Sequence, residues 1–192
     1  MKEPTPENIK KLFDNYFKAD LSVWEKFSKH VSVRRYRKNE NIKEYNSVEK
    51  YVNILIHGSV GLFVWNGTDD ICINLFYEHE LFSDYLSFLK QKETAIKSQA
   101  LEDCEIWSVR YESLQGLYQE GVAGVHVGKI IAEELFIEKQ SEQIDLLTLS
   151  PTERYKKLLA EKSKILRRTP LKVIASYLGV LPESLSRIRT RI

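Results

Sequence analysis

The chain has 192 residues, of which 43% are hydrophobic and 29% are charged. These values are typical of a folded globular protein and argue against a disordered, collagen-like or disulfide-scaffold chain. The net charge of +2 hides an uneven distribution along the sequence. Residues 151–192 contain eleven basic and three acidic residues, a net charge of +8, whereas residues 1–150 carry a net charge of −6. An acidic body followed by a basic tail indicates a nucleic-acid partner.

Membrane, metal and catalytic signals are missing from the sequence. No run approaches the ~18–20 apolar residues of a membrane helix, and no secretion signal follows Met1, so we expect a cytoplasmic protein with no membrane partner. Cys72 and Cys104 have no metal-ligand spacing and fall in predicted strands, so we expect buried structural thiols and no metal. The chain shows no Ser/His/Asp arrangement and no glycine-rich phosphate loop, and therefore we expect no enzyme.

The first 110 residues divide into a helical start and a region of short strands. Residues 7–30 repeat apolar side chains every three to four residues, which predicts two short helices. Residues 31–110 contain β-favouring runs separated by polar turns, and Asn66-Gly67 between two of them is a hairpin signal. The runs are 31–36, 51–56, 60–65, 71–76, 95–100 and 104–109. Their number and spacing predict an antiparallel sandwich, roll or barrel.

A long helix is predicted from Val125 to Leu147, a stretch with no proline and no glycine after Gly128. Apolar residues form an imperfect heptad stripe along it, which Glu134 and Ser141 interrupt. The stripe consists of Val127, Ile130, Ile131, Leu135, Ile137, Ile144 and Leu147. It can pack against the chain's own domain or form the seam of a dimer, and the periodicity does not decide between the two.

A helix-capping sequence predicts a domain boundary at about residues 148–150. In Ser150-Pro151-Thr152-Glu153 the serine can accept from the amide three residues on, and the glutamate can reach back to the serine amide. Proline suits the first helical position. A new helix, and with it the basic segment, therefore begins here.

The end of the sequence predicts a helix–turn–helix unit. A short helix can run over 171–178, Gly179 favours the left-handed conformation that ends it, and Pro182 can open a second helix. At ~100° per residue, Leu185, Ile188 and Ile192 share one face of this second helix. The opposite face carries the candidate base-reading residues Glu183, Arg187, Thr190 and Arg191. The candidate phosphate-binding residues are Lys172, Ser184, Ser186 and Arg189.

These residue types suit recognition of double-stranded DNA. Arginine can donate two hydrogen bonds to guanine, and glutamate can accept one from cytosine. Phosphate contacts position a protein on the duplex without specifying the sequence. An ordinary helical hairpin with a solvated basic face would show the same spacing, and the +8 charge of the segment favours DNA binding over it.

The stretch Ile174–Gly179 followed by Pro182–Arg189 resembles the helix-turn-helix of the Crp/Fnr family of bacterial transcription regulators, closest to the short members found in Bacteroidetes. The order of predicted elements is similar over essentially the whole chain. The resemblance implies an α+β fold, in which an antiparallel β-roll similar to a cyclic-nucleotide-binding domain, of the double-stranded β-helix or jelly-roll type, is flanked by helices. A long dimerisation helix and a helix-turn-helix domain follow. The corresponding domains are 1–120, 121–149 and 150–192.

The resemblance implies a homodimer in which Glu183 and Arg187 contact bases in the two half-sites of a palindromic site. The stripe of the long helix then becomes the dimer seam, and RNA polymerase becomes a further partner. Two features depart from the family pattern. Leu181 stands where Ser, Thr or Asp often caps the recognition helix, and such a cap is typically worth ~1 kcal/mol. The sequence stops at Ile192 without the wing of longer members, which predicts a shallower salt dependence.

The effector pocket matches the family only in part. The family holds a ribose with a Gly-Glu pair and a cyclic phosphate with an arginine about ten residues on, and here these positions are Ser83-Asp84 and Thr94. Because a cyclic phosphate requires a cation, we expect no cyclic nucleotide and no other cofactor, unless Lys92 or Lys97 compensates. The candidate pocket residues are Asp84, Tyr85, Thr94 and Ala95. The identity and the existence of a small-molecule effector stay open.

Two functions are compatible with these patterns. The leading prediction is a dimeric, sequence-specific DNA-binding transcription regulator. The alternative is a ligand-binding or interaction module of the same fold that does not read DNA specifically. Salt-dependent binding to a palindromic site distinguishes the two.

Overall fold

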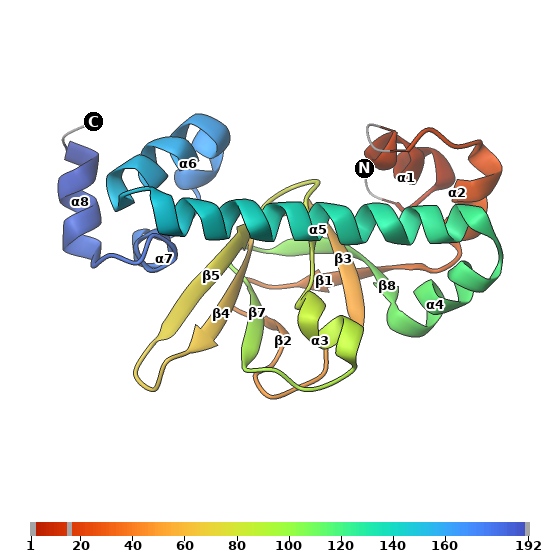
Figure 1. Cartoon of the computed structure of the whole chain (residues 1–192), viewed down its shortest axis with the longest axis horizontal. Helices are drawn as coiled ribbons and strands as arrows, with labels where there is room; N and C mark the ends of the chain where they lie inside the picture. The colour runs from red at the N-terminus through yellow and green to blue at the C-terminus, as the bar shows by residue number, and fades with distance from the viewer. Residues whose placement is uncertain (1–2, 15–16, 191–192) are drawn as a thin grey trace.

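The computed structural model describes residues 3–14 and 17–190, except for the side chains of residues 161–166. Helices stand at both ends of the chain and strands lie between them (Figure 1). The helices are α1 (Pro6–Phe13), α2 (Leu21–Ser28), α3 (Tyr85–Lys90), α4 (Tyr111–Gln119), α5 (Val122–Thr148), α6 (Pro151–Leu166), α7 (Leu171–Tyr177) and α8 (Pro182–Thr190). The strands are β1 (Val31–Tyr36), β2 (Asn41–Lys43), β3 (Tyr51–His57), β4 (Val60–Trp65), β5 (Asp70–Phe76), β6 (Leu81–Phe82), β7 (Ile96–Ala100) and β8 (Cys104–Arg110).

The strands form two four-stranded sheets, in the orders β1-β8-β3-β6 and β2-β7-β4-β5, and all their pairings are antiparallel. The prediction of an antiparallel roll is confirmed. The hairpin at Asn66-Gly67 is also present, because Trp65 pairs with Asp70 and Gly67 has a φ of +100°. Its loop holds four residues, and the Asn66 side chain accepts hydrogen bonds from the amides of Thr68 and Asp69.

Four apolar cores hold the described part of the chain together, and one of them joins β4 and β5 to α7. Buried residues of both sheets, among them Leu55, Phe76 and Ile106, pack between the sheets. A larger core joins the first sheet to α1, α2, α4 and α5, with Trp24 and Trp107 at its centre. The third core lies among α6, α7 and α8. Helix α5 runs along the length of the molecule, with α1 and α2 near one end and α6 to α8 at the other (Figure 1).

Helix α5 begins at Val122, earlier than the predicted Val125, and includes two glycines. Their role is close packing against α4. A Cβ atom on Gly124 would lie 1.9 Å from the carbonyl oxygen of Leu117, and one on Gly128 would lie 2.2 Å from the Tyr118 ring. Glycine here permits two helix backbones to approach, so it does not mark the end of a helix.

The predicted stripe of α5 divides into two sets of residues. Val127, Ile130, Ile131 and Leu135 are at most 9% exposed and pack in the core of their own chain. Ile137, Ile144 and Leu147 are exposed. For the first four residues the dimer-seam interpretation was wrong, and packing against the chain's own domain, the alternative left open, is what the structure shows. The apolar period of a helix does not say which apolar face meets the chain's own sheet.

The predicted boundary near residue 150 coincides with the break between α5 and α6. The Ser150 hydroxyl accepts from the Glu153 amide at 3.3 Å, and the Glu153 carboxylate accepts from the Ser150 amide at 2.8 Å. This reciprocal pair is the predicted capping box. In the part of the chain that the structure describes, no helix is long and apolar enough to cross a membrane.

Candidate nucleic-acid interface and effector pocket

Helices α7 and α8 form a small packed unit with a glycine turn between them. Ile174, Leu178 and Leu185 are at most 3% exposed and build its interior. Gly179 has a φ of +66°, its amide donates to the Ser176 carbonyl, and the Val180 amide donates to the Ala175 carbonyl. This pair of hydrogen bonds is the Schellman motif, which requires a left-handed residue at the glycine position. The predicted helix–turn–helix is therefore present in its local geometry.

Helix α8 has one buried and one exposed face. Leu185 is fully buried and Ile188 is half-buried, whereas Glu183, Arg187 and Thr190 are exposed as predicted. The Arg187 guanidinium donates to the Ser184 hydroxyl at 3.2 Å, a weak restraint that another acceptor can replace. Arg191, the fourth predicted base-reading residue, lies outside the described residues, as does Ile192.

The predicted phosphate-binding residues lie around this face. Ser186 and Arg189 are exposed on α8, and Ser184 is half-buried. Lys172, at the start of α7, is 3.4 Å from the Asp69 carboxylate, and both of these side chains are more than half exposed. An exposed pair of this kind contributes ~1 kcal/mol at most, so a phosphate can displace the aspartate.

The helix–turn–helix unit is docked on the β-roll. The Ser176 hydroxyl accepts a hydrogen bond from the Cys72 amide of β5 at 2.8 Å, and the hydroxyls of Tyr77 and Thr169 lie 2.9 Å apart. Arg168, in the loop before α7, adds ion pairs to the contact between this unit and the β-roll. Its guanidinium is 2.7 Å from the carboxylate of Glu78 and 2.8 Å from that of Glu102.

These docking contacts were not predicted, because each joins residues more than sixty positions apart.

The two cysteines are buried as predicted. Burial raises the pKa of Cys72 to about 12 and that of Cys104 to about 11, which keeps both thiols protonated and unreactive.

The predicted effector pocket of the β-roll is occupied by the chain's own side chains. Asp84 caps α3 by accepting from the Ser87 amide at 3.2 Å, and its other oxygen accepts from the Thr94 hydroxyl. The ammonium of Lys43, on β2, lies 3.1 Å from Asp84 and donates to the Ile96 carbonyl at 2.7 Å. The side chains of Lys43 and Asp84 are 3% and 1% exposed. The structure thus brings Asp84 and Thr94 together, as predicted, around a lysine that was not predicted.

The other pocket candidates do not join this cluster. Tyr85 stacks on Phe88 with the ring centroids 5.9 Å apart, and Ala95 is exposed. Lys97, which we considered as a compensating cation, forms an ion pair with Asp70.

A buried carboxylate lies next to the cluster. Glu49 is 3% exposed, and its Oε1 accepts from the Tyr51 amide at 3.0 Å. Its Oε2 is buried and has no hydrogen-bond partner among the described residues. Burial raises the pKa of Glu49 to about 7, against the opposing effects of the Tyr51 amide and the Lys43 ammonium. The side chain therefore titrates near neutral pH.

Among the described residues, no group of three or more His, Cys, Asp or Glu side chains is placed to hold a metal ion.

The comparisons with solved structures identify the fold. No family model matches the sequence, and no curated protein matches it either. FixK2 from Bradyrhizobium japonicum superposes with a TM-score of 0.70 at 19% identity, over 84% of this chain and 83% of that protein. The c-di-GMP responsive global regulator CLP from Xanthomonas campestris gives a TM-score of 0.69 at 20% identity, over 90% and 91%.

A third structure, of a protein from Eubacterium rectale assigned to the Crp/Fnr family of transcriptional regulators, gives a TM-score of 0.68 at 14% identity, over 92% of this chain and 87% of that protein. Each match covers more than four fifths of this chain. The chain therefore has the fold of the Crp/Fnr regulators, with a cyclic-nucleotide-binding type of β-roll and a C-terminal helical domain.

Proposed function

We propose that this protein is a transcription regulator that binds double-stranded DNA as a homodimer and reads the sequence with α8. The observation that carries the proposal is the exposed face of α8, where Glu183 and Arg187 lie one turn apart opposite the buried Leu185. The segment that presents this face has a net charge of +8. A positive segment attracts the DNA backbone, and a free arginine can bind guanine through two hydrogen bonds.

Residues beside this face would position the helix on the duplex. Lys172 and Arg189 would bind phosphate oxygens, and Ser184 and Ser186 would donate from their hydroxyls. Helix α8 begins at Pro182, whose preceding residue Leu181 offers no side-chain cap. The positive end of α8 is thereby left open to a phosphate.

The exposed face of α5 supports the homodimer. Besides Leu146, six apolar residues of this helix are each more than half exposed. They are Val122, Val125, Phe136, Ile137, Ile144 and Leu147. A second copy of the chain would bury this face without disturbing the core, and a two-fold axis along α5 would present two α8 helices to half-sites about 34 Å apart.

The β-roll cluster argues that the regulator does not respond to a cyclic nucleotide at the family's position. The Asp84 carboxylate, which would hold a ribose, is bonded to Thr94 and Lys43. The Lys43 ammonium lies among Asp84, Thr94 and the Ile96 carbonyl, and it is buried there. A nucleotide would have to break this buried ion pair, which is costly. We propose RNA polymerase as a further protein partner of this regulator in the cytoplasm.

Selection of bound fragments from a random DNA pool, at defined salt, tests this function. We expect a two-fold symmetric motif with half-sites about one helical turn apart, and an affinity that falls as the salt concentration rises. Sedimentation of the free protein should show a dimer. A pool with no enriched motif would contradict the proposal and favour an interaction module that does not read DNA.

A further inference from the structure

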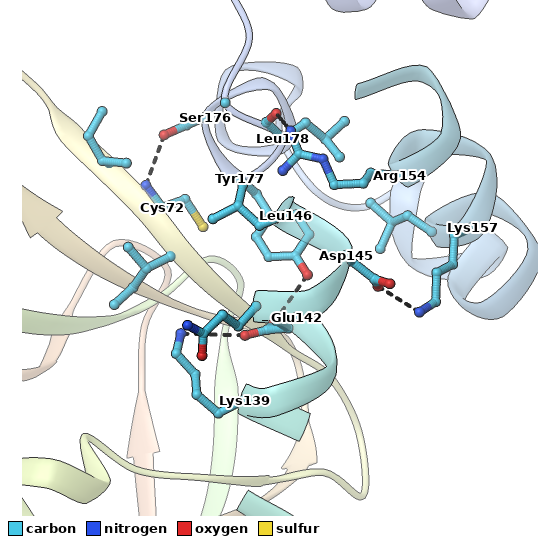
Figure 2. Close-up of a pocket in the computed structure, with 15 residues that line it drawn as sticks. Cys72, Lys139, Glu142, Asp145, Leu146, Arg154, Lys157, Ser176, Tyr177 and Leu178 are labelled. Atoms are coloured by element: carbon cyan, nitrogen blue, oxygen red, sulfur yellow. Dashed lines mark hydrogen bonds and ion pairs between the residues drawn. The ribbon is translucent and has the colours of Figure 1, made fainter. Parts of the chain in front are cut away.

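A cavity of about 360 Å³ lies where the long helix, the β-roll and the helix–turn–helix domain meet (Figure 2). Its walls come from β5, from the C-terminal part of α5, and from α6 and α7. The volume is in the range of small-molecule sites in proteins, which are roughly 300–1,000 Å³. It is separate from the Lys43–Asp84–Thr94 cluster, because none of those residues lines it.

Most of the cavity wall is apolar. Ile71 and Ile73 contribute from β5, Leu146 from α5 and Leu158 from α6. Leu146 is 59% exposed, so one side of the cavity opens to solvent and allows entry. Such walls suit an aromatic or short aliphatic group, which gains affinity in proportion to the apolar area removed from water.

Among the described residues of the polar wall, Arg154 is the cation without an acidic partner. Lys157 lies 2.6 Å from the Asp145 carboxylate, and Lys139 lies 3.5 Å from Glu142. Arg154 lies at the α6–α7 side of the cavity and donates from one terminal nitrogen to the Leu178 carbonyl at 2.7 Å (Figure 2). Its Nε is buried and has no hydrogen-bond partner among the described residues, and no acid among them pairs with its guanidinium.

A buried donor on a charged group is stabilised when an acceptor reaches it, most strongly by an anion. A carboxylate suits a guanidinium best, since the two planar groups can share parallel hydrogen bonds.

We propose that this cavity binds a small organic acid, whose carboxylate pairs with Arg154 and whose aromatic or short aliphatic body lies against Ile71, Ile73, Leu146 and Leu158. The ligand contacts walls that belong to both the β-roll and the helix–turn–helix domain. It binds only while α7 rests on β5, as it does through the bond from the Cys72 amide to Ser176. By linkage, it stabilises this docked arrangement. The regulatory consequence rests on the proposed DNA-binding function, whereas the site itself does not.

Calorimetric titration of the full chain with 2-naphthoate and with 2-naphthamide tests the site without DNA. The two probes share one aromatic body and differ in the anionic head. We expect 2-naphthoate to bind at least about tenfold more tightly than the amide, as expected for a hydrogen bond to a charged group.

Two variants with matched controls assign the binding to this cavity. Arg154→Gln should remove the preference for the acid, while Lys156→Gln, an exposed cation of α6 that does not line the cavity, should keep it. Leu146→Trp fills the cavity from its open side and should abolish binding of both probes. Leu89→Trp, at an exposed leucine of α3, should leave binding unchanged. Circular dichroism confirms that each variant is folded.

Three results would overturn the proposal: no binding of either probe at about 1 mM, equal affinity for the acid and the amide, or unchanged binding in Leu146→Trp. None of these depends on DNA. A protein that binds naphthoate as expected but enriches no DNA motif would refute the proposed function and keep the site.

Discussion

The β-roll and helix α8 use charged residues in opposite ways. In the β-roll, Lys43 and Asp84 are almost completely buried and 3.1 Å apart, so each neutralises the other inside the fold. On α8, Glu183 and Arg187 are exposed, and Arg187 is restrained only by a serine hydroxyl at 3.2 Å. The comparison teaches that a charge is available to a partner only where the chain has not already paired it in its interior. The predicted effector position is thus filled by the chain's own buried ion pair, whereas Glu183 and Arg187 are open to a partner.

Removing one member of the buried pair should have the largest effect. Asp84→Ala leaves the Lys43 ammonium buried without an acid and removes the cap of α3, so the free energy of unfolding should fall by about 3–5 kcal/mol. Urea denaturation measures this loss. Lys129→Ala is the control, because the Lys129–Glu133 pair on α5 is more than half exposed and should contribute less than about 0.5 kcal/mol.

Replacing both members of the buried pair separates charge pairing from packing. Lys43→Met combined with Asp84→Leu leaves no buried charge, so most of the stability lost in Asp84→Ala should return. If Asp84→Ala and Lys129→Ala have equal effects, the contrast between buried and exposed charges is wrong.

Glu49 should make the stability of the β-roll depend on pH near neutrality. Its pKa is raised from 4.5 to about 7 in the folded chain, so its contribution is fully present below pH 4.5 and is lost as the pH rises to about 7. The substitution Glu49→Gln removes the carboxyl group, and with it this decrease in the free energy of unfolding as the pH rises. The variant should exceed the wild type in the free energy of unfolding by up to about 3 kcal/mol at pH 8, and the difference should shrink towards pH 5. A difference that is constant between pH 5 and pH 8 would contradict this assignment.

The exposed apolar face of α5 should be a second surface available to a partner. Ile144→Asp places a carboxylate on each side of the proposed seam, and the dimer should weaken by about 3 kcal/mol or roughly 100-fold. Sedimentation velocity over a range of concentrations measures the dissociation. Leu89→Asp adds the same charge at an exposed leucine of α3, outside this face, and should leave the dimer intact. Equal effects of the two variants would place the seam elsewhere.

The free charge on α8 should matter for DNA and not for folding. Arg187→Ala should weaken binding to the selected site by about 1–3 kcal/mol and relax the base preference at one position, because arginine can read guanine with two hydrogen bonds. Its free energy of unfolding should change by less than about 0.5 kcal/mol. Fluorescence anisotropy with labelled DNA measures the affinity. Arg35→Ala, at an exposed arginine of β1, removes the same charge and should bind DNA as the wild type does.

Local signals in the sequence predicted the local structure well. Three features each depend on residues within five positions of one another: the capping box of Ser150 and Glu153, the left-handed Gly179 and the hairpin at Asn66-Gly67. Short-range hydrogen bonds determine such features, so the sequence alone identifies them.

The set of side chains that fills the β-roll pocket could not be predicted in the same way. Lys43 and Asp84 are forty-one positions apart, and only the pairing of β2 with β7 brings the lysine to Asp84 and Thr94. The lysines near Thr94 in the sequence are Lys92 and Lys97, and the structure pairs Lys97 with Asp70. The stripe of α5 shows the same limit, because an apolar period marks burial without naming the surface that covers it.

The smallest effect should come from charges that hold the helix–turn–helix domain to the β-roll. Arg168→Ala removes ion pairs with Glu78 and Glu102, and because the arginine is partly exposed the loss should be about 1 kcal/mol. Burial raises the pKa of Glu78, but the Arg168 hydrogen bonds outweigh it and hold that pKa below 4.5. The contribution is therefore present above pH 4.5 and lost as the pH falls, so urea denaturation at pH 7 should separate variant and wild type more than at pH 4. The neighbouring exposed Arg167→Ala should show no such difference, and if it does, the domain contact depends on general charge and not on this pairing.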